Sequence, residues 1–526
     1  MTLVGYVPVP PDRAERYRRA GHWTGAGLAD LVLGPPGGDR ERRVALVDGE
    51  ERVTYGELRA ASHRLAARLR GLGLRRQDRV VVQLPNGVPF VTLLLALWRL
   101  GAVPVLALPA HREHELRHLL TMSGAGALAI PARLHRANHV AVARRLIGGR
   151  GLLLVLGEAG LRPGEIDLGA AMRTPAPRRE DGTGPAGGDV ALLLLSGGST
   201  GLPKLIPRTH DDYGCNLRVS AELAGLDEDS VYLAALPAGH NFALGCPGVM
   251  GTLLRGGRVV LGPPALGVVT RERVTVTAVV PGLAARWADA VATGGPPPRT
   301  LRLLQVGGAH LAPDVARRLR RVLGCAVQQV YGMAEGLLCF TRLDDPDDVV
   351  VGTQGRPALL DDEVRIVDGE LQARGPYTIA GYFRAPEVNA VAFTADGFYR
   401  TGDLVRRDPS GNLVVEGRVK DVINRSGEKI AAAELEDLAL AHPGVAEAAA
   451  VAMPDAASGE AVCLYAVARG PAVPTLEEIR SFLDGLGLAR YKLPDRLEVV
   501  AGLPLTAVGK VDKAALRERV ARGSRV

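Results

Sequence analysis

Lysine and aromatic residues are scarce in this sequence. Only 4% of the 526 residues are aromatic, and no stripe of basic and aromatic side chains stands out, which argues against a nucleic-acid-binding protein. The 64 basic residues include only six lysines, and none of these precedes Lys204. In a chain that uses arginine almost everywhere, the few positions that keep lysine are candidates for chemistry. They are Lys204, Lys420, Lys429, Lys492, Lys510 and Lys513.

Cysteine is also rare, and no long uninterrupted apolar run is present. The five cysteines are scattered without the spacing of a metal site, which favours a reducing setting, and we expect a cytoplasmic protein. The amino-terminal residues lack the apolar core of a signal peptide. The longest apolar stretch, 91–108, is interrupted by Arg99, and it is interpreted as a core helix followed by a strand instead of a membrane span.

The composition is that of a globular protein with a large core and more than one domain: 47% of the residues are hydrophobic and 23% are charged. Residues 53–72 have helical spacing, with a start signal at Thr54 and Glu57. Short apolar runs alternate with helical patterns, and this predicts an α/β fold with mostly parallel sheets. These runs are 79–84, 103–107, 152–156, 190–195, 259–261 and 301–306. Residues 173–188 have the composition of a surface loop.

The carboxy-terminal fifth of the chain reads as a separate unit. Residues 400–425 are rich in turn signals, with a short strand near 413–416, and the rest has its own alternation of strands and helices. We therefore expect a large N-terminal domain with several subdomains, 1–419, and a small mobile α+β lid, 420–526. The hinge is predicted near Lys420.

The most informative segment is VALLLLSGGSTGLPK, 190–204. An apolar strand leads into a loop of small residues whose backbone N–H groups and hydroxyls suit a polyphosphate, with Lys204 as a point charge. The spacing is not that of a Walker A loop, and a flexible surface loop is the structural alternative. The loop residues are Ser196, Gly197, Gly198, Ser199, Thr200 and Gly201.

This loop resembles the phosphate loop of the adenylate-forming enzymes, which include acyl-CoA synthetases, luciferases and nonribosomal-peptide adenylation domains. Nearly the whole chain shares the resemblance. Further matching motifs are VGGA from Val306, VYGMAEG from Val330, YRTGD from Tyr399, EGRVKD from Glu416, NRSGEKI from Asn424 and LPLTAVGKVDK from Leu503. Several of them, together with THDDY and HNF, are similar to the stand-alone aryl-acid–AMP ligases of siderophore-type nonribosomal peptide pathways.

The resemblance implies two half-reactions. An aryl acid and ATP, with Mg²⁺, give aryl-AMP and pyrophosphate, and the aryl group then passes to the phosphopantetheine thiol of an aryl carrier protein. Because the chain ends shortly after Lys513, we expect the carrier to be a separate protein. No nucleic-acid or membrane partner is expected, and the oligomeric state stays open, with a homodimer as one option.

The resemblance also implies roles for individual residues. Lys510 would reach the substrate carboxylate and the α-phosphate, Glu335 would bind Mg²⁺, and Lys204 and His240 would complete the catalytic group. Lys420 would lie at the hinge and beside the nucleotide, and Lys429 near the pantetheine tunnel, whereas Lys492 and Lys513 are predicted on the lid surface. The remaining predicted nucleotide contacts are Gly307, Gly308, Ala309, Val330, Tyr331, Gly332, Met333, Ala334, Asp403 and Arg418.

The aryl pocket is expected at AGHNFALGCPG, 238–248. Asn241 would hydrogen-bond the carboxylate and an ortho-hydroxyl. Cys246 and Leu338 replace the serine and valine of 2,3-dihydroxybenzoate enzymes, and this pair is the one found in salicylate-activating members, so we predict salicylate. The other predicted substrate contacts are Phe242, Ala309, Gly336 and Lys429.

Alternatives stay open. Cys339 stands where the branch has asparagine and could admit a methylated salicylate; 3-hydroxypicolinate and 2,3-dihydroxybenzoate are further options, and the pocket changes could be neutral repacking. An aryl-CoA ligase would share almost every motif, and a non-catalytic adenylate-binding protein is the alternative outside enzymes.

His210 and its acidic neighbours are interpreted as structural polar residues. The shortened segment 364–375 is interpreted as a tight turn at Asp368 and Gly369.

Overall fold

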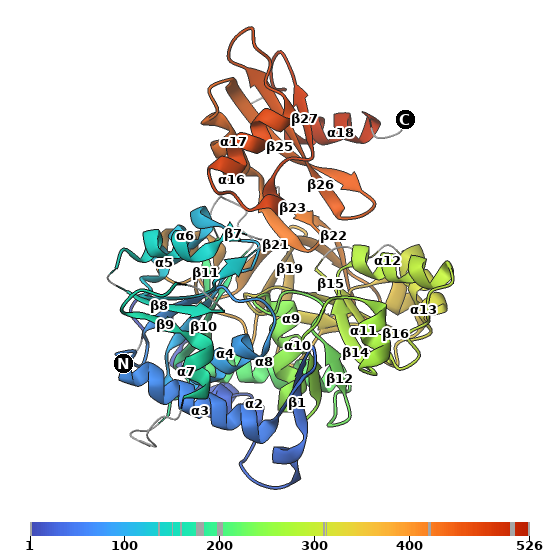
Figure 1. Cartoon of the computed structure of the whole chain (residues 1–526). Coiled ribbons are helices and arrows are strands. Elements are labelled where there is room, and N and C mark those ends of the chain that lie inside the picture. Colours follow the sequence, from blue (N-terminus) through green and yellow to red (C-terminus); the bar gives the residue numbers. More distant parts are fainter. Residues whose placement is uncertain are drawn as a thin grey trace.

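The structure is a computed structural model, which describes residues 3–134, 137–149, 151–157, 160–174, 184–196, 203–308, 311, 313–418, 422–504 and 511–523. The described residues form two large sheets, a four-stranded antiparallel sheet, a two-stranded sheet of β6 Arg133–Leu134 and β7 Ala137–Asn138, and a separate carboxy-terminal sheet. Figure 1 shows the carboxy-terminal part, in orange and red, above a broad core that holds the other sheets. We call described residues 3–418 the core and described residues 422–523 the lid.

One large sheet has seven strands in the order β11-β10-β4-β3-β5-β8-β9. All neighbouring pairs are parallel except β10 with β11. Its strands read as short runs of valine, leucine and alanine because both faces of most of them are buried. The bounds are β3 Arg79–Val82, β4 Val103–Leu106, β5 Ala127–Pro131, β8 Leu152–Leu156, β9 Glu165–Asp167, β10 Val190–Leu195 and β11 Leu205–Thr209.

The other large sheet has nine strands in the order β18-β17-β16-β15-β14-β12-β13-β1-β2. Its interior, from β16 to β1, is parallel, and both of its edges are antiparallel. The bounds are β1 Val44–Asp48, β2 Glu51–Thr54, β12 Val231–Leu233, β13 Arg258–Val260, β14 Val276–Val279, β15 Leu303–Gly307, β16 Ala326–Gly332, β17 Leu338–Phe340 and β18 Arg356–Pro357.

Helices connect the parallel strands and fill the space between the two sheets. The largest apolar cluster contains side chains of α3, α4, α8 and α10 together with strands of both sheets. The core helices are α1 Pro11–Arg19, α2 Leu28–Leu33, α3 Tyr55–Gly71, α4 Val88–Leu100, α5 Glu113–Ser123, α6 His139–Ile147, α7 Leu168–Arg173, α8 His210–Leu223, α9 Asn241–Gly245, α10 Gly248–Leu254, α11 Leu266–Arg271, α12 Pro281–Ala292, α13 Pro313–Leu323, α14 Asp347–Gly352 and α15 Pro386–Ala392.

A four-stranded antiparallel sheet leads from the core to the lid. Its strands are β19 Glu363–Val367, β20 Glu370–Arg374, β21 Tyr399–Arg407 and β22 Leu413–Arg418. The turn between β19 and β20 consists of Asp368 and Gly369, which have φ angles of 52° and 80°. This is the tight turn that the sequence predicts, with two left-handed residues that match the twist of the hairpin.

The lid has its own sheet and its own apolar clusters. Strands β23 Val422–Arg425, β24 Glu428–Ala431, β25 Val445–Asp455 and β26 Gly459–Ala468 pair antiparallel, and β27 Arg496–Val499 joins β26 in parallel. Helices α16 Ala432–Leu440, α17 Leu476–Gly485 and α18 Lys513–Gly523 and the short 3₁₀ helix Arg490–Lys492 complete it. Two apolar clusters use lid residues alone.

The fold class predicted from the sequence is confirmed. The runs 152–156 and 190–195 are strands over their whole predicted length, and the stretch 91–108 contains α4 followed by β4. Thr54 caps α3 in a reciprocal pair with Glu57, as the start signal predicts. The predicted boundary at Lys420 lies outside the described residues, and most of the predicted loop 173–188 does too.

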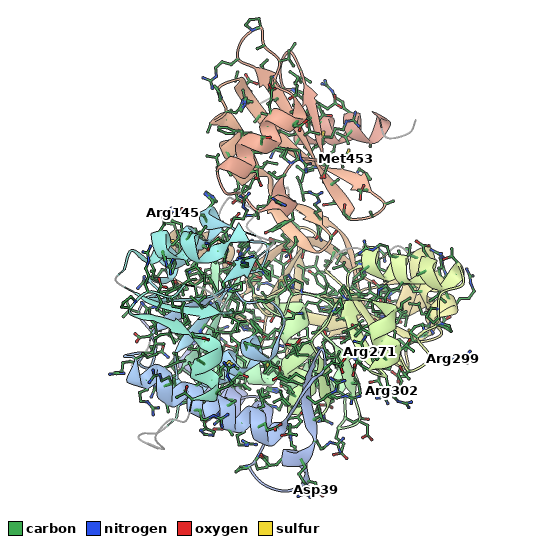
Figure 2. The ribbon with its side chains drawn as sticks, viewed as in Figure 1. Asp39, Arg145, Arg271, Arg299, Arg302 and Met453 are labelled. Carbon is green, nitrogen blue, oxygen red and sulfur yellow. The ribbon has the colours of Figure 1, made fainter. Side chains whose placement is uncertain are left out.

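The positive charge of the chain is distributed over the molecule. Figure 2 shows Arg145 on α6 and Arg271 at the end of α11 on opposite sides of the core. Many arginines pair with acidic neighbours, for example Arg145 with Glu113 at 2.6 Å. The distribution agrees with the spread of charge along the sequence.

Candidate active site

A cavity of about 750 Å³ lies between the core and the lid. Leu106, Leu195 and Gly308, which end or follow β4, β10 and β15, line it. The cavity is therefore at the carboxyl ends of parallel strands of both large sheets, where open α/β sheets bind their ligands. The lid contributes its first hairpin, and Figure 1 shows β23 directly above the core.

The two ends of the predicted phosphate loop are joined at the cavity. The Ser196 N–H donates to the Lys204 carbonyl at 2.9 Å, and the Lys204 N–H donates to Ser196 Oγ at 3.1 Å. Ser196 lines the cavity. The rest of the loop, Gly197, Gly198, Ser199, Thr200 and Gly201, lies outside the described residues.

Tyr382 connects two predicted catalytic residues. Its hydroxyl donates to Glu335 Oε1 at 2.8 Å, and Lys204 Nζ lies 4.9 Å from the centre of its ring. The Tyr382 hydroxyl also lies 3.0 Å from the hydroxyl of Tyr399, the first residue of the YRTGD motif. Glu335 is buried and lines the cavity. Glu335 and Lys204 thus come from separate motifs and contact one tyrosine.

Several of the predicted nucleoside residues line the cavity. Gly308, Val330, Tyr331, Gly332, Met333 and Ala334 line it. Asp403 is buried there, and its Oδ2 accepts a hydrogen bond from the Tyr331 hydroxyl at 2.8 Å. Arg418 pairs with Asp403 across β21 and β22, while its side chain and Ala309 lie outside the description.

His240 stands at the beginning of the short helix α9. Its Nδ1 accepts a hydrogen bond from the Phe242 N–H at 3.3 Å, so that the ring caps the helix. Burial, followed by the nearby charge of Lys429, lowers the pKa of His240 to about 4. The imidazole is therefore neutral at physiological pH and cannot act as a fixed positive charge beside the cavity.

Asn241 is held by two buried neighbours. Its Oδ1 accepts a hydrogen bond from the Tyr213 hydroxyl at 2.9 Å, and its Nδ2 donates to Cys246 Sγ at 3.4 Å. Burial raises the pKa of Cys246 to about 12, so its thiol stays protonated. Asn241, Cys246, Phe242 and Leu338, which the sequence predicts for an aryl pocket, all line the cavity.

Three residues near this pocket do not line the cavity. Cys339 is buried behind Leu338 because successive residues of β17 face opposite sides of the sheet. Gly336 has a φ of 149°, and a Cβ there would lie 2.3 Å from Thr378 Cα. A Cβ on Gly307 would lie 2.5 Å from the Val330 carbonyl oxygen. The two glycines therefore permit close packing around the site and are not placed at the cavity wall.

The hairpin of β23 and β24 reaches into the cavity from the lid. Asn424 Nδ2 donates to the Gly308 carbonyl at 2.7 Å, which joins the hairpin to the predicted adenine wall. Its partner across the hairpin, Lys429, lines the cavity and is close enough to His240 to affect the pKa of that ring. The structure therefore brings Lys429 near His240, which belongs to the segment predicted for the aryl pocket.

The prediction that Lys492 belongs to the lid surface is wrong. Lys492 is only 4% exposed, and its Nζ lies 2.9 Å from Glu434 Oε2 in the lid and 3.5 Å from Glu115 Oε1 in the core. Glu115 also accepts the N–H groups of Arg112 and Ala489. Burial alone would raise the pKa of Glu115, but the charge of Lys492 and these donors bring it below its ordinary value.

The contacts of Tyr213, Tyr382, Glu115 and Glu434 described above were not predicted from the sequence, and Lys492 was given no chemical role. Tyr213 lies in the THDDY motif, so a signal existed; the other contacts join distant parts of the chain. Two predicted residues of the site, Lys420 and Lys510, lie outside the described residues.

The polar residues at the start of α8 have structural contacts. His210 Nδ1 accepts from the Leu28 N–H at 3.0 Å, and Asp211 accepts from the Gly25 N–H at 2.7 Å. Asp212 caps α8 and pairs with the buried Arg208 at 2.6 Å. These contacts agree with the interpretation of all three as structural residues.

Within the described part of the chain, no group of three histidine, cysteine or acidic residues is arranged to hold a metal ion by itself. No helix there is long and apolar enough to cross a bilayer. A cation at Glu335 would therefore need oxygen ligands from a bound molecule as well, which is how Mg²⁺ commonly binds to nucleotide enzymes.

Known proteins share both the sequence and the fold. The AMP-binding enzyme family matches residues 38–383, and the AMP-binding enzyme C-terminal domain matches residues 434–510. A salicylyl-CoA synthase / salicylate adenylyltransferase from Streptomyces sp is 52% identical over 99% of this chain and 99% of its own. The 2,3-dihydroxybenzoate-AMP ligase of Bacillus subtilis is 46% identical over 98% of both.

Among solved structures, apo MbtA of Mycobacterium smegmatis has a TM-score of 0.73 and 44% identity, over 98% of this chain and 99% of that one. The amide bond synthetase McbA of Marinactinospora thermotolerans has a TM-score of 0.82 at 27% identity, over 94% and 100%. The chain therefore belongs to the AMP-binding enzyme family and is an ATP-dependent, AMP-forming ligase.

Proposed function

We propose that this ligase activates salicylate, or a close ortho-hydroxy aryl acid, as its acyl-AMP and passes the aryl group to the phosphopantetheine thiol of a separate aryl carrier protein. The pocket of Asn241, Cys246 and Leu338 at one end of the cavity carries the proposal. Relatives named as salicylate and 2,3-dihydroxybenzoate ligases support it. The pocket combines one amide with apolar and weakly polar walls, which suits an aromatic ring with one ortho substituent.

In the first half-reaction, a carboxylate oxygen of the aryl acid attacks the α-phosphorus of ATP. The new bond is P–O to the acyl oxygen, and the bond to the β-phosphate breaks, so that pyrophosphate leaves. The reacting groups are both anionic, and catalysis is therefore mainly positioning and charge neutralisation. Lys204 would neutralise charge on the polyphosphate, and Lys510 would neutralise charge on the carboxylate and the α-phosphate. Asp403 would accept hydrogen bonds from the ribose hydroxyls.

The residues present fit a Mg²⁺ ion shared with the nucleotide. Glu335 is a cavity-lining carboxylate held by the Tyr382 hydroxyl, and Mg²⁺ is usually bound by one or two carboxylates together with substrate phosphates. When bound, the ion would offset negative charge on the departing pyrophosphate. Glu335 would hold it, and Tyr382 would keep the carboxylate turned toward the cavity.

In the second half-reaction, the thiol sulfur attacks the acyl carbon, the bond from that carbon to the phosphate oxygen breaks, and AMP leaves; the thiol proton goes to solvent. We place Lys429 and the neutral His240 beside this step because both line the cavity next to the aryl end. The lid, 420–526 with its hinge near Lys420, would change position between the two steps.

Salicylate is favoured over 2,3-dihydroxybenzoate because Cys246 is a weak hydrogen-bond partner for a 3-hydroxyl. Burying such a hydroxyl without a good partner costs about 1–3 kcal/mol, or roughly 10- to 100-fold in preference. Cys339 cannot make room for a methyl group directly, because it is not at the cavity wall. The residue at position 339 is therefore no reason to expect a methylated salicylate as the substrate.

The test is ATP–pyrophosphate exchange with salicylate, 6-methylsalicylate, 2,3-dihydroxybenzoate, 3-hydroxypicolinate and benzoate. We expect the highest kcat/KM for salicylate, and we expect Cys246→Ser to raise the ratio of 2,3-dihydroxybenzoate to salicylate. Exchange at background with every acid would contradict the proposal. An unchanged ratio in Cys246→Ser would contradict the assignment of the pocket.

A second candidate is an aryl-CoA ligase, because a relative at 52% identity carries both salicylyl-CoA synthase and salicylate adenylyltransferase in its name. The two candidates share the first half-reaction and differ only in the thiol. Offering coenzyme A and a phosphopantetheinylated aryl carrier to the same preformed aryl-AMP separates them. Faster transfer to the carrier is the expected result.

A further inference from the structure

A buried tyrosine behind the aryl pocket fixes the orientation of Asn241. Tyr213 lies on α8 and is fully buried, so it does not line the cavity itself. Its hydroxyl donates to Asn241 Oδ1 at 2.9 Å. The Arg208 guanidinium lies 5.0 Å from the centre of the Tyr213 ring, and Arg208 is itself paired with Asp212. The contact of Arg208 with the Tyr213 ring therefore helps to fix the position of the Tyr213 hydroxyl.

The orientation of an asparagine amide decides what it offers to a ligand. Its oxygen only accepts hydrogen bonds and its NH₂ group only donates them, and the two ends have nearly the same shape. The Tyr213 proton occupies the oxygen of Asn241, and the NH₂ group is directed toward Cys246 Sγ at 3.4 Å. A protonated thiol is a weak acceptor, so the NH₂ group keeps donor capacity for a ligand in the cavity.

We propose that Tyr213 is a positioning residue that makes Asn241 a hydrogen-bond donor, so that the pocket selects aryl acids with an acceptor atom ortho to the carboxylate. This inference rests on the proposed function. A salicylate hydroxyl donates a hydrogen bond to its own carboxylate and accepts one from Asn241 through a lone pair. An ortho-amino group directs an N–H at the Asn241 NH₂ group, and two donors then face each other.

Equilibrium binding to the full chain tests this with salicylate, benzoate and 2-aminobenzoate, measured by titration calorimetry. We expect the unmodified protein to bind salicylate at least about 10-fold more tightly than 2-aminobenzoate. In Tyr213→Phe the amide is free to turn its oxygen to the cavity. The affinity ratio should then fall to within about threefold, with 2-aminobenzoate gaining and benzoate unchanged.

Tyr55→Phe is the matched control. Its hydroxyl is also buried and donates to backbone carbonyls, at 2.6 Å for Gly257, but it does not contact Asn241. We expect Tyr55→Phe to keep the ratio of the unmodified protein. Equal weakening of all three acids by Tyr213→Phe, or an unchanged ratio, would overturn the role of Tyr213.

Asn241→Asp keeps the test decisive even if Tyr213→Phe does not fold. A carboxylate has only acceptor oxygens, so this variant should prefer 2-aminobenzoate to salicylate; no shift toward the amine would overturn the inference. The outcomes also separate the two proposals. An unmodified protein that binds ATP but none of the acids would overturn both, whereas salicylate binding with a ratio insensitive to either variant would overturn only this inference.

Discussion

At the scale of single residues, Tyr382 joins two charges that the proposed chemistry needs. Its hydroxyl donates to Glu335, and its ring lies under the ammonium of Lys204. Phenylalanine removes the hydroxyl contact alone, and leucine removes both contacts.

We expect Tyr382→Phe to raise the Mg²⁺ concentration required for half-maximal pyrophosphate exchange, by roughly 10-fold for the loss of one hydrogen bond to a charged group. Tyr382→Leu should in addition raise the KM for ATP. Binding of Mn²⁺ in the presence of ATP, followed by electron paramagnetic resonance, checks the first effect without turnover. Tyr399→Phe, which removes only the neighbouring hydroxyl, is the control, and equal effects of the two phenylalanine variants would contradict a specific role for Tyr382.

Asp362 gives a pH prediction at the same scale. It accepts hydrogen bonds from the Tyr377 hydroxyl and the Leu359 N–H, and burial raises its pKa to about 7. The pKa of an aspartate in the unfolded chain is near 4. At pH values between about 4 and about 7, the folded state therefore holds a proton that the unfolded state has lost. The contribution of Asp362 to the free energy of unfolding falls as the pH rises through this range.

Asp362→Asn imitates the protonated acid and removes this dependence. The free energy of unfolding of the variant minus that of the unmodified protein should therefore rise by about 1 kcal/mol per pH unit from pH 5 to pH 7 and level off above that. Urea unfolding followed by circular dichroism at several pH values measures it. A difference that stays constant over this range would show that Asp362 is ionised in the folded protein.

At the scale of elements, β17 places two neighbouring residues in different environments. Leu338 lines the cavity, while Cys339 is buried on the other side of the strand. We expect Leu338→Val to raise the rate with 2,3-dihydroxybenzoate relative to salicylate, because it returns space to the pocket. Cys339→Ala should lower the unfolding temperature but leave that ratio unchanged. A change of the ratio in Cys339→Ala would mean that the strand transmits packing changes to the pocket.

The sequence predicts elements well where the pattern is local. The runs 152–156 and 190–195 are buried strands, Thr54 and Glu57 cap a helix, and Asp368 with Gly369 forms a two-residue turn. Several described motif residues, among them Ser196, Gly308 and Glu335, line one cavity, because the carboxyl ends of parallel strands lie at the same edge of a sheet.

Contacts between distant parts of the chain could not be predicted in this way. The sequence around Lys492 does not show that it is buried, because its core partner Glu115 is 377 residues away. Tyr213 is the last residue of the THDDY motif, and Tyr382 lies in none of the motifs; the hydrogen bonds of their hydroxyls to Asn241 and Glu335 depend on the tertiary fold.

At the scale of the whole molecule, the lid is joined to the core by polar groups. Glu115 on α5 contacts Lys492 and the Ala489 N–H, and Arg112 at the start of α5 pairs with Asp484. Figure 1 shows α16, which carries Glu434, on the side of the lid above α5 and α6. The side chain of Glu115 is therefore a bridge between the two units.

In this lid position Lys429, which we place beside the transfer step, lines the cavity. If this position serves aryl transfer, Glu115→Gln should slow transfer from preformed aryl-AMP by roughly 10-fold, for a loss of about 1.4 kcal/mol in lid docking, and spare pyrophosphate exchange. The amide has a single acceptor oxygen, so it can still accept one of the two backbone N–H groups, but it does not attract Lys492. Glu113→Gln is the control, because Glu113 pairs with Arg117 and Arg145 of the core. If both half-reactions slow equally in Glu115→Gln, the bridge stabilises the fold and does not select this lid position.

The apolar clusters give this interface a further property. Each cluster of described residues is drawn either from residues 3–415 or from residues 423–520, and none contains both. A lid attached in this way exposes little apolar surface to water when it leaves the core. Its release would have a small heat-capacity change, since that quantity follows newly hydrated apolar area, so the equilibrium between lid positions should respond strongly to ionic strength and only weakly to temperature.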